Sequence, residues 1–313
     1  EEVRKDLPIA PLADELLGPV AKRIMGSARE LGYEWEKLDK AIFQDRCKPG
    51  HYPYRARWNS RHYLREAVAH GAEVRSQAEV RRVLLEGKRA RGVAFSANGT
   101  EQEVLASRVV VCAGGIGSPQ LLQASGIGSI GQGFFCDPLI AVFGTAEGIQ
   151  DVGEFPMAAG IHLPDEGYMM TDLPVPKQTY QMLTLSALRP DRLFAHSSTL
   201  TIMVKIRDEI AGHVSSRKMR RVFGPPEREK LASGYRRSKE ILRRAGATKI
   251  FKSRVTAAHP GGSIRIGEHV DANLQTEYEG LYVCDCSVIA DPWGMPPTLT
   301  LLSLAKRLAK HLA

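Results

Sequence analysis

The sequence lacks long hydrophobic runs and has few cysteines. No apolar run approaches the roughly 18 residues that a membrane-spanning helix needs, so we expect no transmembrane span. The five cysteines are odd in number and irregularly spaced. They argue against a disulfide framework and favour a reducing, cytoplasmic location. Cys284 and Cys286 alternate along an apolar segment without a neighbouring Cys/His cluster, so we expect no metal site.

Features of nucleic-acid-binding proteins and of hydrolases are also missing. The chain carries 43 Lys and Arg against 35 Asp and Glu, a net charge of +8. Its densest basic patches, at residues 217–221 and 236–237, are not interleaved with aromatic residues, so we interpret them as solvated helix surface rather than a nucleic-acid site. Ser118 lies in Gly-Ile-Gly-Ser-Pro, which lacks the G-x-S-x-G spacing of a hydrolase nucleophile.

The composition is that of a globular protein with room for two lobes. The chain has 313 residues, of which 43% are hydrophobic and 25% charged, and this length can bury a large core. Apolar periodicity followed by glycine predicts helices over residues 19–31, 60–70 and 226–245. Alternating or β-branched runs bounded by turn residues predict strands, first over residues 73–75, 79–86, 90–96 and 104–111, and later over 137–143, 157–162, 181–187 and 199–205.

The most informative segment is the C-terminal one, from residue 258 to 313. It places His259 on a Gly-rich turn, then an apolar strand ending in Asp285, and then an amphipathic helix that opens at Thr298 after a Pro-flanked turn. A helix start offers N–H groups to an oxygen that gains negative charge, and a histidine accepts protons near neutral pH. The same spacing also fits an ordinary strand-turn-helix with a structural histidine, and spacing alone leaves both interpretations open.

A second segment distinguishes them. Residues 107–128 read SRVVVCAGGIGSPQLLQASGIG, a buried strand, a glycine turn and a helix closed by Gly126. Together with His259-Pro-Gly-Gly-Ser, Leu-Tyr-Val-Cys-Asp285 and Pro-Thr298-Leu-Thr, this segment resembles the glucose-methanol-choline (GMC) family of flavin oxidoreductases. The resemblance is clear over about residues 40–130 and 250–313 and weak between them.

The resemblance implies an α/β and α+β fold. Residues 1–130 would form the first portion of a partial, Rossmann-like FAD-binding domain with a β-meander. Residues 131–250 would form a substrate-binding domain with an antiparallel sheet, and residues 251–313 would return to the FAD-binding domain with the catalytic histidine and the terminal helix.

The implied activity is the oxidation of CH–OH groups in a small-molecule alcohol, with FAD as hydride acceptor and oxygen or another compound as final electron acceptor. His259 would take the hydroxyl proton, and Thr298 would cap the last helix. The resemblance places the remaining flavin contacts at a set of backbone and polar positions: Val80, Ala113, Gly114, Asp285, Cys286 and Pro297.

Two departures from the family keep alternatives open. No GxGxxG strand-turn-helix, initiator Met or signal peptide stands near the start of the sequence, which favours a fragment, a processed chain or an incomplete gene. Pro296 occupies the slot where many relatives carry an Asn or His beside the catalytic histidine. Either one histidine suffices, another residue substitutes, or activity is lost. The rival functions are a non-catalytic or interaction subunit unable to hold FAD alone, and a lyase on the same fold.

Overall fold

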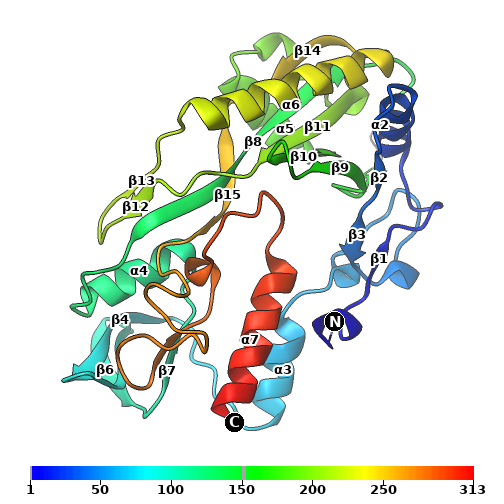
Figure 1. Cartoon of the computed structure of the whole chain (residues 1–313). Coiled ribbons are helices and arrows are strands. Elements are labelled where there is room, and N and C mark those ends of the chain that lie inside the picture. Colours follow the sequence, from blue (N-terminus) through cyan, green and yellow to red (C-terminus); the bar gives the residue numbers. More distant parts are fainter. Residues whose placement is uncertain (1, 150–152) are drawn as a thin grey trace. The chain divides into compact units, whose positions relative to one another are not determined.

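The computed structural model describes residues 2–149 and 153–313, which divide into two compact units (Figure 1). Unit 1 comprises Glu1–Trp58, Pro138–Arg207 and Gly224–Ala257, and unit 2 comprises Asn59–Asp137, Asp208–Phe223 and Ala258–Ala313. Within the described ranges, no helix is both long and apolar enough to cross a membrane.

Unit 1 is built on an antiparallel sheet. Strand β8 (Gln132–Thr145), most of which belongs to this unit, pairs with β11 (Thr199–Ile206) in a register that sets Val142 opposite Ile202. The order continues through β10 (Tyr168–Asp172), β9 (Ala159–Leu163) and β2 (Glu36–Lys37), while β14 (Thr248–Lys252) pairs with β8. Every residue of β11 is buried, as expected for a strand covered on both faces.

Helices cover both faces of this sheet. Because side chains alternate along β8, Ile140 and Val142 pack against α2 (Pro19–Glu30) and α6 (Pro225–Arg244), which lie on the same face (Figure 1). Ala141 and Phe143 face the other way, where Phe143 meets Tyr180 of α5 (Lys177–Ser186) edge to face. Shorter elements complete unit 1: α1 (Glu2–Lys5), β1 (Ile9–Pro11), β3 (Asp39–Ala41), and 3₁₀ turns at Gln44–Arg46, Tyr54–Ala56, Pro190–Arg192 and His196–Ser198.

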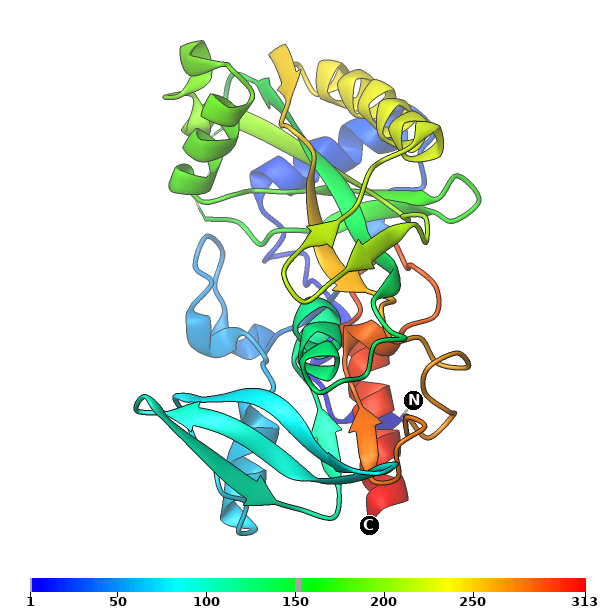
Figure 2. The same cartoon turned by 90° about the vertical axis from the view of Figure 1, so that its left-hand side faces the viewer.

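Unit 2 contains an antiparallel meander of β4 (Ala78–Glu86), β5 (Arg89–Ala97) and β6 (Thr100–Leu105) (Figure 2). The turn between β5 and β6 is made by Asn98 and Gly99, both with positive φ (52° and 78°). This is the conformation that tight hairpins require and that Asn-Gly adopts readily.

The rest of unit 2 is organised around two parallel strands, β7 (Val109–Val111) and β16 (Leu281–Val283). Helix α4 (Gly114–Ala124) follows β7 directly, and leucines of α7 (Thr298–Leu312) pack on the same apolar core. The remaining elements are α3 (Arg61–Ala69), β12 (Gly212–Val214), β13 (Met219–Arg220), the 3₁₀ turn η5 (Cys286–Val288) and β15 (Thr256–Gly261), which begins in unit 1.

Several expectations from the sequence are corrected by the structure. Residues 181–187 lie largely in helix α5, where Tyr180 and Thr184 are buried one helical turn apart, a spacing that the apolar run did not reveal. Residues 73–75 form no strand. The expected strand over residues 104–111 is broken after Leu105, because β7 leaves the meander to pair with β16. Cys112, which ends the apolar run that the sequence presents as a buried strand, is exposed.

Candidate active site

His259 lies on β15 in an unusual backbone conformation. Its φ is +51°, in the left-handed region that histidine enters more often than most non-glycine residues but still seldom. The ring atom Nδ1 lies 3.1 Å from Oδ2 of Asp137 on β8. The His259 side chain is 29% exposed and the Asp137 side chain is fully buried. A partly exposed imidazole is thus joined to a carboxylate within unit 2.

The Asp137 carboxylate also contacts the turn that precedes α7. Its Oδ1 accepts a hydrogen bond from the Gly294 N–H at 3.3 Å. Gly294 stands four residues before Thr298, the first residue of α7. The buried Asp137 side chain therefore links β15, which carries the histidine, to the turn before α7.

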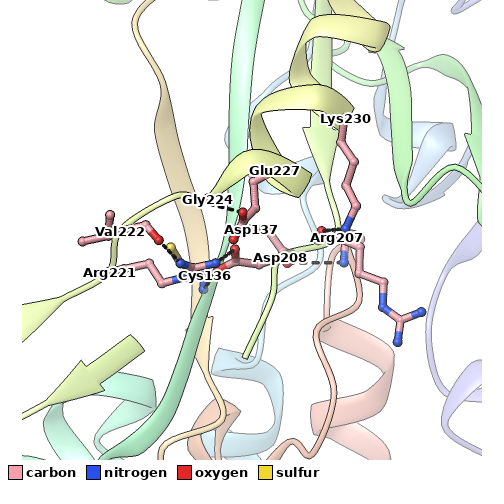
Figure 3. Close-up of polar contacts among 10 residues, drawn as sticks. Cys136, Asp137, Arg207, Asp208, Arg221, Val222, Gly224, Glu227 and Lys230 are labelled. Atoms are coloured by element: carbon pink, nitrogen blue, oxygen red, sulfur yellow. Dashed lines mark hydrogen bonds and ion pairs between the residues drawn. The ribbon is translucent and has the colours of Figure 1, made fainter. Parts of the chain in front are cut away.

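The backbone next to Asp137 is fixed by a buried ion pair. Figure 3 shows the Asp208 carboxylate between Arg221 and the backbone of Cys136. Asp208 Oδ2 accepts from the Cys136 N–H at 2.9 Å and from Arg221 Nε at 3.1 Å, and Oδ1 accepts from Arg221 Nη2 at 2.5 Å. Burial raises the pKa of the Asp208 carboxyl, and the Arg221 guanidinium opposes that rise. Such a bidentate pair is stable inside a protein only where its hydrogen bonds are satisfied, as they are here.

Glycines at the start of α4 and after His259 permit close packing. A Cβ atom on Gly115 would stand 2.0 Å from the Pro260 carbonyl oxygen, and one on Gly262 would stand 2.5 Å from the Phe135 ring. Gly262 also has a φ of +77°, which favours glycine. The Ser263 Oγ donates to the Gly115 carbonyl oxygen at 2.9 Å. The start of α4 and the His-Pro-Gly-Gly turn are therefore in direct backbone contact.

The expected flavin-contact residues Ala113, Gly114, Asp285 and Cys286 all follow the carboxyl ends of β7 and β16. Because these strands are parallel and adjacent, their carboxyl ends share one edge, which is where ligands bind in open α/β sheets. Ala113 is exposed. Gly114 has a φ of +83° with open space where a Cβ would stand.

Asp285 makes four hydrogen bonds within the protein. Its Oδ2 accepts from the Gly114 N–H at 2.8 Å and from Ser118 Oγ at 2.5 Å. Its Oδ1 accepts from the Ser287 N–H at 2.8 Å and from Ser287 Oγ at 2.6 Å. A carboxylate offers about four lone-pair directions, so these bonds use its capacity and tie the end of β16 to the start of α4.

Thr298 does not cap α7. The N-cap position is Pro297, which is buried, and Thr298 is the first helical residue. The N-cap residue, Pro297, makes no side-chain cap hydrogen bond to the helix start. A residue inside the first turn cannot adopt the extended conformation of a capping Ser or Thr. The N–H groups of this first turn are consequently left for another acceptor.

The other candidate positions have simpler surroundings. Val80 lies on β4 opposite Phe95 and is 39% exposed. Burial raises the pKa of the Cys136 and Cys284 thiols to about 12 and that of Cys286 to about 11, so these thiols stay protonated at neutral pH. In the part of the chain that the structure describes, no His, Cys, Asp and Glu residues gather as a metal site would require.

Asp137 is a candidate site residue that sequence reasoning missed, since it entered only as the first residue of an expected strand. A signal was present: it interrupts the apolar run Phe-Phe-Cys-Asp-Pro-Leu-Ile-Ala-Val-Phe. A charged residue in a buried strand is rare unless it is paired. This pattern indicates that Asp137 is paired but does not identify its partner.

Comparisons with known proteins agree with this architecture. A long-chain-alcohol oxidase of Arabidopsis thaliana is 24% identical over 82% of the chain and 44% of its own length. An uncharacterized protein of Methanocaldococcus jannaschii is 24% identical over the whole chain, which spans 79% of that protein. The crystal structure of pyridoxine 4-oxidase from Mesorbium loti superposes with a TM-score of 0.77 at 18% identity, over 97% of this chain and 71% of the other.

The family profiles give the assignment. Residues 1–142 match the N-terminal domain and residues 184–305 the C-terminal domain of GMC oxidoreductases, whose members normally bind FAD. The two matches cover most of the chain and include β7, α4, His259 and the start of α7. The chain belongs to the GMC oxidoreductase family.

Proposed function

We propose that the chain is an FAD-dependent oxidoreductase that oxidises the CH–OH group of a small alcohol, with His259 as the acceptor of the hydroxyl proton. The observation that carries the proposal is the pairing of His259 Nδ1 with the buried Asp137 carboxylate. The printed activity of the plant long-chain-alcohol oxidase supports an alcohol substrate. Oxygen or another compound would accept the electrons finally.

The residues at the strand ends are suited to FAD. The backbone at Ala113 and Gly114 is approachable, because Ala113 is exposed and the space beside Gly114 is open. The first turn of α7 offers N–H donors and the positive end of a helix dipole to an oxygen that gains negative charge. We propose that Cys286, Pro297 and Thr298 contribute through their backbone, and that Val80 does so from the meander.

When bound, FAD supplies the acceptor for the hydrogen and the electron pair that leave the alcohol carbon. The chain's own residues would accept the hydroxyl proton and hold the accepting ring in a fixed direction. His259 holds Nδ1 toward Asp137, so the other ring nitrogen, Nε2, is the atom that would receive the hydroxyl proton. Asp285 would act indirectly, by holding the Gly114 turn in shape.

The test compares wild type with His259→Ala after loading with FAD. Without oxygen, alcohols should bleach the oxidised-flavin absorbance of the wild type, while His259→Ala should retain FAD and bleach at least 10²-fold more slowly, a typical contribution of a general base. The control is His62→Ala, an exposed histidine on α3, which should bleach at the wild-type rate.

Equal bleaching in His259→Ala and wild type would remove this histidine from the mechanism. A wild-type chain that binds no FAD would favour the rival function, a non-catalytic subunit. FAD binding followed by conversion of substrate without bleaching would favour the lyase.

A further inference from the structure

We propose that Asp137 is a positioning residue for His259: its buried carboxylate holds the imidazole as the Nδ1–H tautomer and thereby presents Nε2 as the proton acceptor. The placement of the ring stands by itself, and its catalytic consequence rests on the proposed function.

Burying the Asp137 carboxylate is costly. The Asp137 side chain has no exposed surface, and burying an ionised group is strongly unfavourable unless it is paired and hydrogen-bonded. Two of its partners are His259 Nδ1 at 3.1 Å and the Gly294 N–H at 3.3 Å. An ionised carboxylate can only accept hydrogen bonds. The hydrogen in the contact with His259 therefore belongs to Nδ1, which fixes the tautomer.

The carboxylate is itself held in place. The preceding residue, Cys136, donates its N–H to the Asp208–Arg221 ion pair, and the following residue is Pro138, whose ring restricts φ. The Gly294 N–H holds the second oxygen. Asp137 therefore has little freedom to rotate away from the histidine.

The histidine is constrained from its own strand as well. Its left-handed φ of +51° costs energy and persists only where neighbouring contacts impose it. These contacts include the close approach of Gly115 to the Pro260 carbonyl and the hydrogen bond from the Gly262 N–H to the Cys286 carbonyl at 3.2 Å. Strain at a residue that also pairs with a buried carboxylate indicates that the direction of this ring is specified.

The experiment measures the tautomer directly, in the chain without flavin. With ¹⁵N-labelled histidine, long-range ¹H–¹⁵N correlations at a pH where the ring is neutral distinguish Nδ1–H from Nε2–H, and His259→Ala assigns the signal. We expect wild type to be mainly Nδ1–H, and Asp137→Asn to lose at least half of that population. The matched control is Asp172→Asn, which alters another fully buried carboxyl, in unit 1, and should leave the His259 tautomer unchanged.

A second variant, Asp137→Ser, covers the case in which the amide distorts the strand. If wild-type His259 is mainly Nε2–H, or if both folded Asp137 variants keep the wild-type tautomer, the proposal is wrong. In the FAD-loaded enzyme we expect Asp137→Asn to lower kcat about 10²-fold with little change in KM, since an orienting carboxylate acts on the chemical step. An equal loss in Asp172→Asn would contradict this.

The two proposals can fail separately. Wild-type chain that shows the Nδ1–H tautomer but is not reduced by alcohols would refute the proposed function and leave the positioning of His259 intact. A wild-type chain that is reduced by alcohols while His259 is mainly Nε2–H would refute the positioning of His259 and leave the proposed function intact.

Discussion

Replacing Gly115 by alanine tests whether α4 and the His259 turn are in true backbone contact. The added Cβ would stand 2.0 Å from the Pro260 carbonyl oxygen and 2.8 Å from the Gly261 nitrogen, and real Cβ atoms essentially never come closer than 3.0 Å to another heavy atom. The turn must therefore retreat by about 1 Å or more, because the obstacle is backbone rather than a flexible side chain.

The magnitude follows from three contributions. Overpacking of this kind costs about 1–3 kcal/mol, and loss of the bond from Ser263 Oγ to the Gly115 carbonyl costs about 1 kcal/mol. Alanine gains at most about 1 kcal/mol over glycine in a helix. We expect Gly115→Ala to destabilise the protein by about 1–3 kcal/mol, and to weaken FAD binding because the turn has moved.

Gly117→Ala is the matched control on the same helix. Its Cβ would meet only the Ala113 Cβ, at 3.1 Å, so the change should be neutral or stabilise by up to about 1 kcal/mol. Urea unfolding gives both values, with constant m-values as the check that the comparison is valid. Equal midpoints for the two variants would refute the packing described for Gly115.

Two further predictions concern the carboxylates of Asp285 and Asp172, both of which accept backbone hydrogen bonds. Asp285→Asn replaces one acceptor oxygen by a donor group and should cost about 2–4 kcal/mol in urea unfolding, with faster hydrogen exchange at the Gly114 amide; unchanged exchange would show that Asp285 does not hold that turn. Burial raises the pKa of the Asp172 carboxyl to about 7. Between about pH 4 and 7 the folded protein therefore keeps a proton on this carboxyl, whereas the unfolded chain has released it. The stabilisation that this carboxyl contributes is present below about pH 4 and is lost as the pH rises to about 7. The free energy of unfolding of wild type relative to Asp172→Asn should therefore fall over this range by an amount on the order of 4 kcal/mol. A pH-independent difference between the two in thermal or urea unfolding would contradict the raised pKa.

Much of the fold follows from local patterns. The helices over residues 19–31 and 226–245 are confirmed within a residue or so as α2 and α6, because apolar spacing and the glycine after each helix both mark their limits. The helix start at Thr298 is also confirmed. The apolar run after Asp137 is confirmed as part of β8.

The errors arose where a local pattern served two structures. At residues 181–187 the mixture of apolar and polar residues fits a strand or a helix equally well. The structure has a helix there, whose buried Tyr180 packs against Phe143. The split between β6 and β7 depends on β16, whose partner residues lie far along the chain. Tertiary pairing overrides propensity in both cases.

The site was only partly predictable for the same reason. His259 was recognisable from its turn and its family resemblance, whereas Asp137 precedes it by 122 residues and no spacing rule connects them. The saturation of Asp285 by Gly114, Ser118 and Ser287 likewise depends on three segments meeting. The sequence can indicate that a carboxylate or histidine has a special role, but the fold determines which residues it pairs with.

The most direct test of the central claim is anaerobic mixing of the FAD-loaded wild-type chain with a panel of primary and secondary alcohols, followed by flavin absorbance. We expect loss of the oxidised-flavin band with at least one alcohol, and its return when a suitable electron acceptor is admitted. A chain that binds FAD stoichiometrically yet keeps that band unchanged with every alcohol would contradict it.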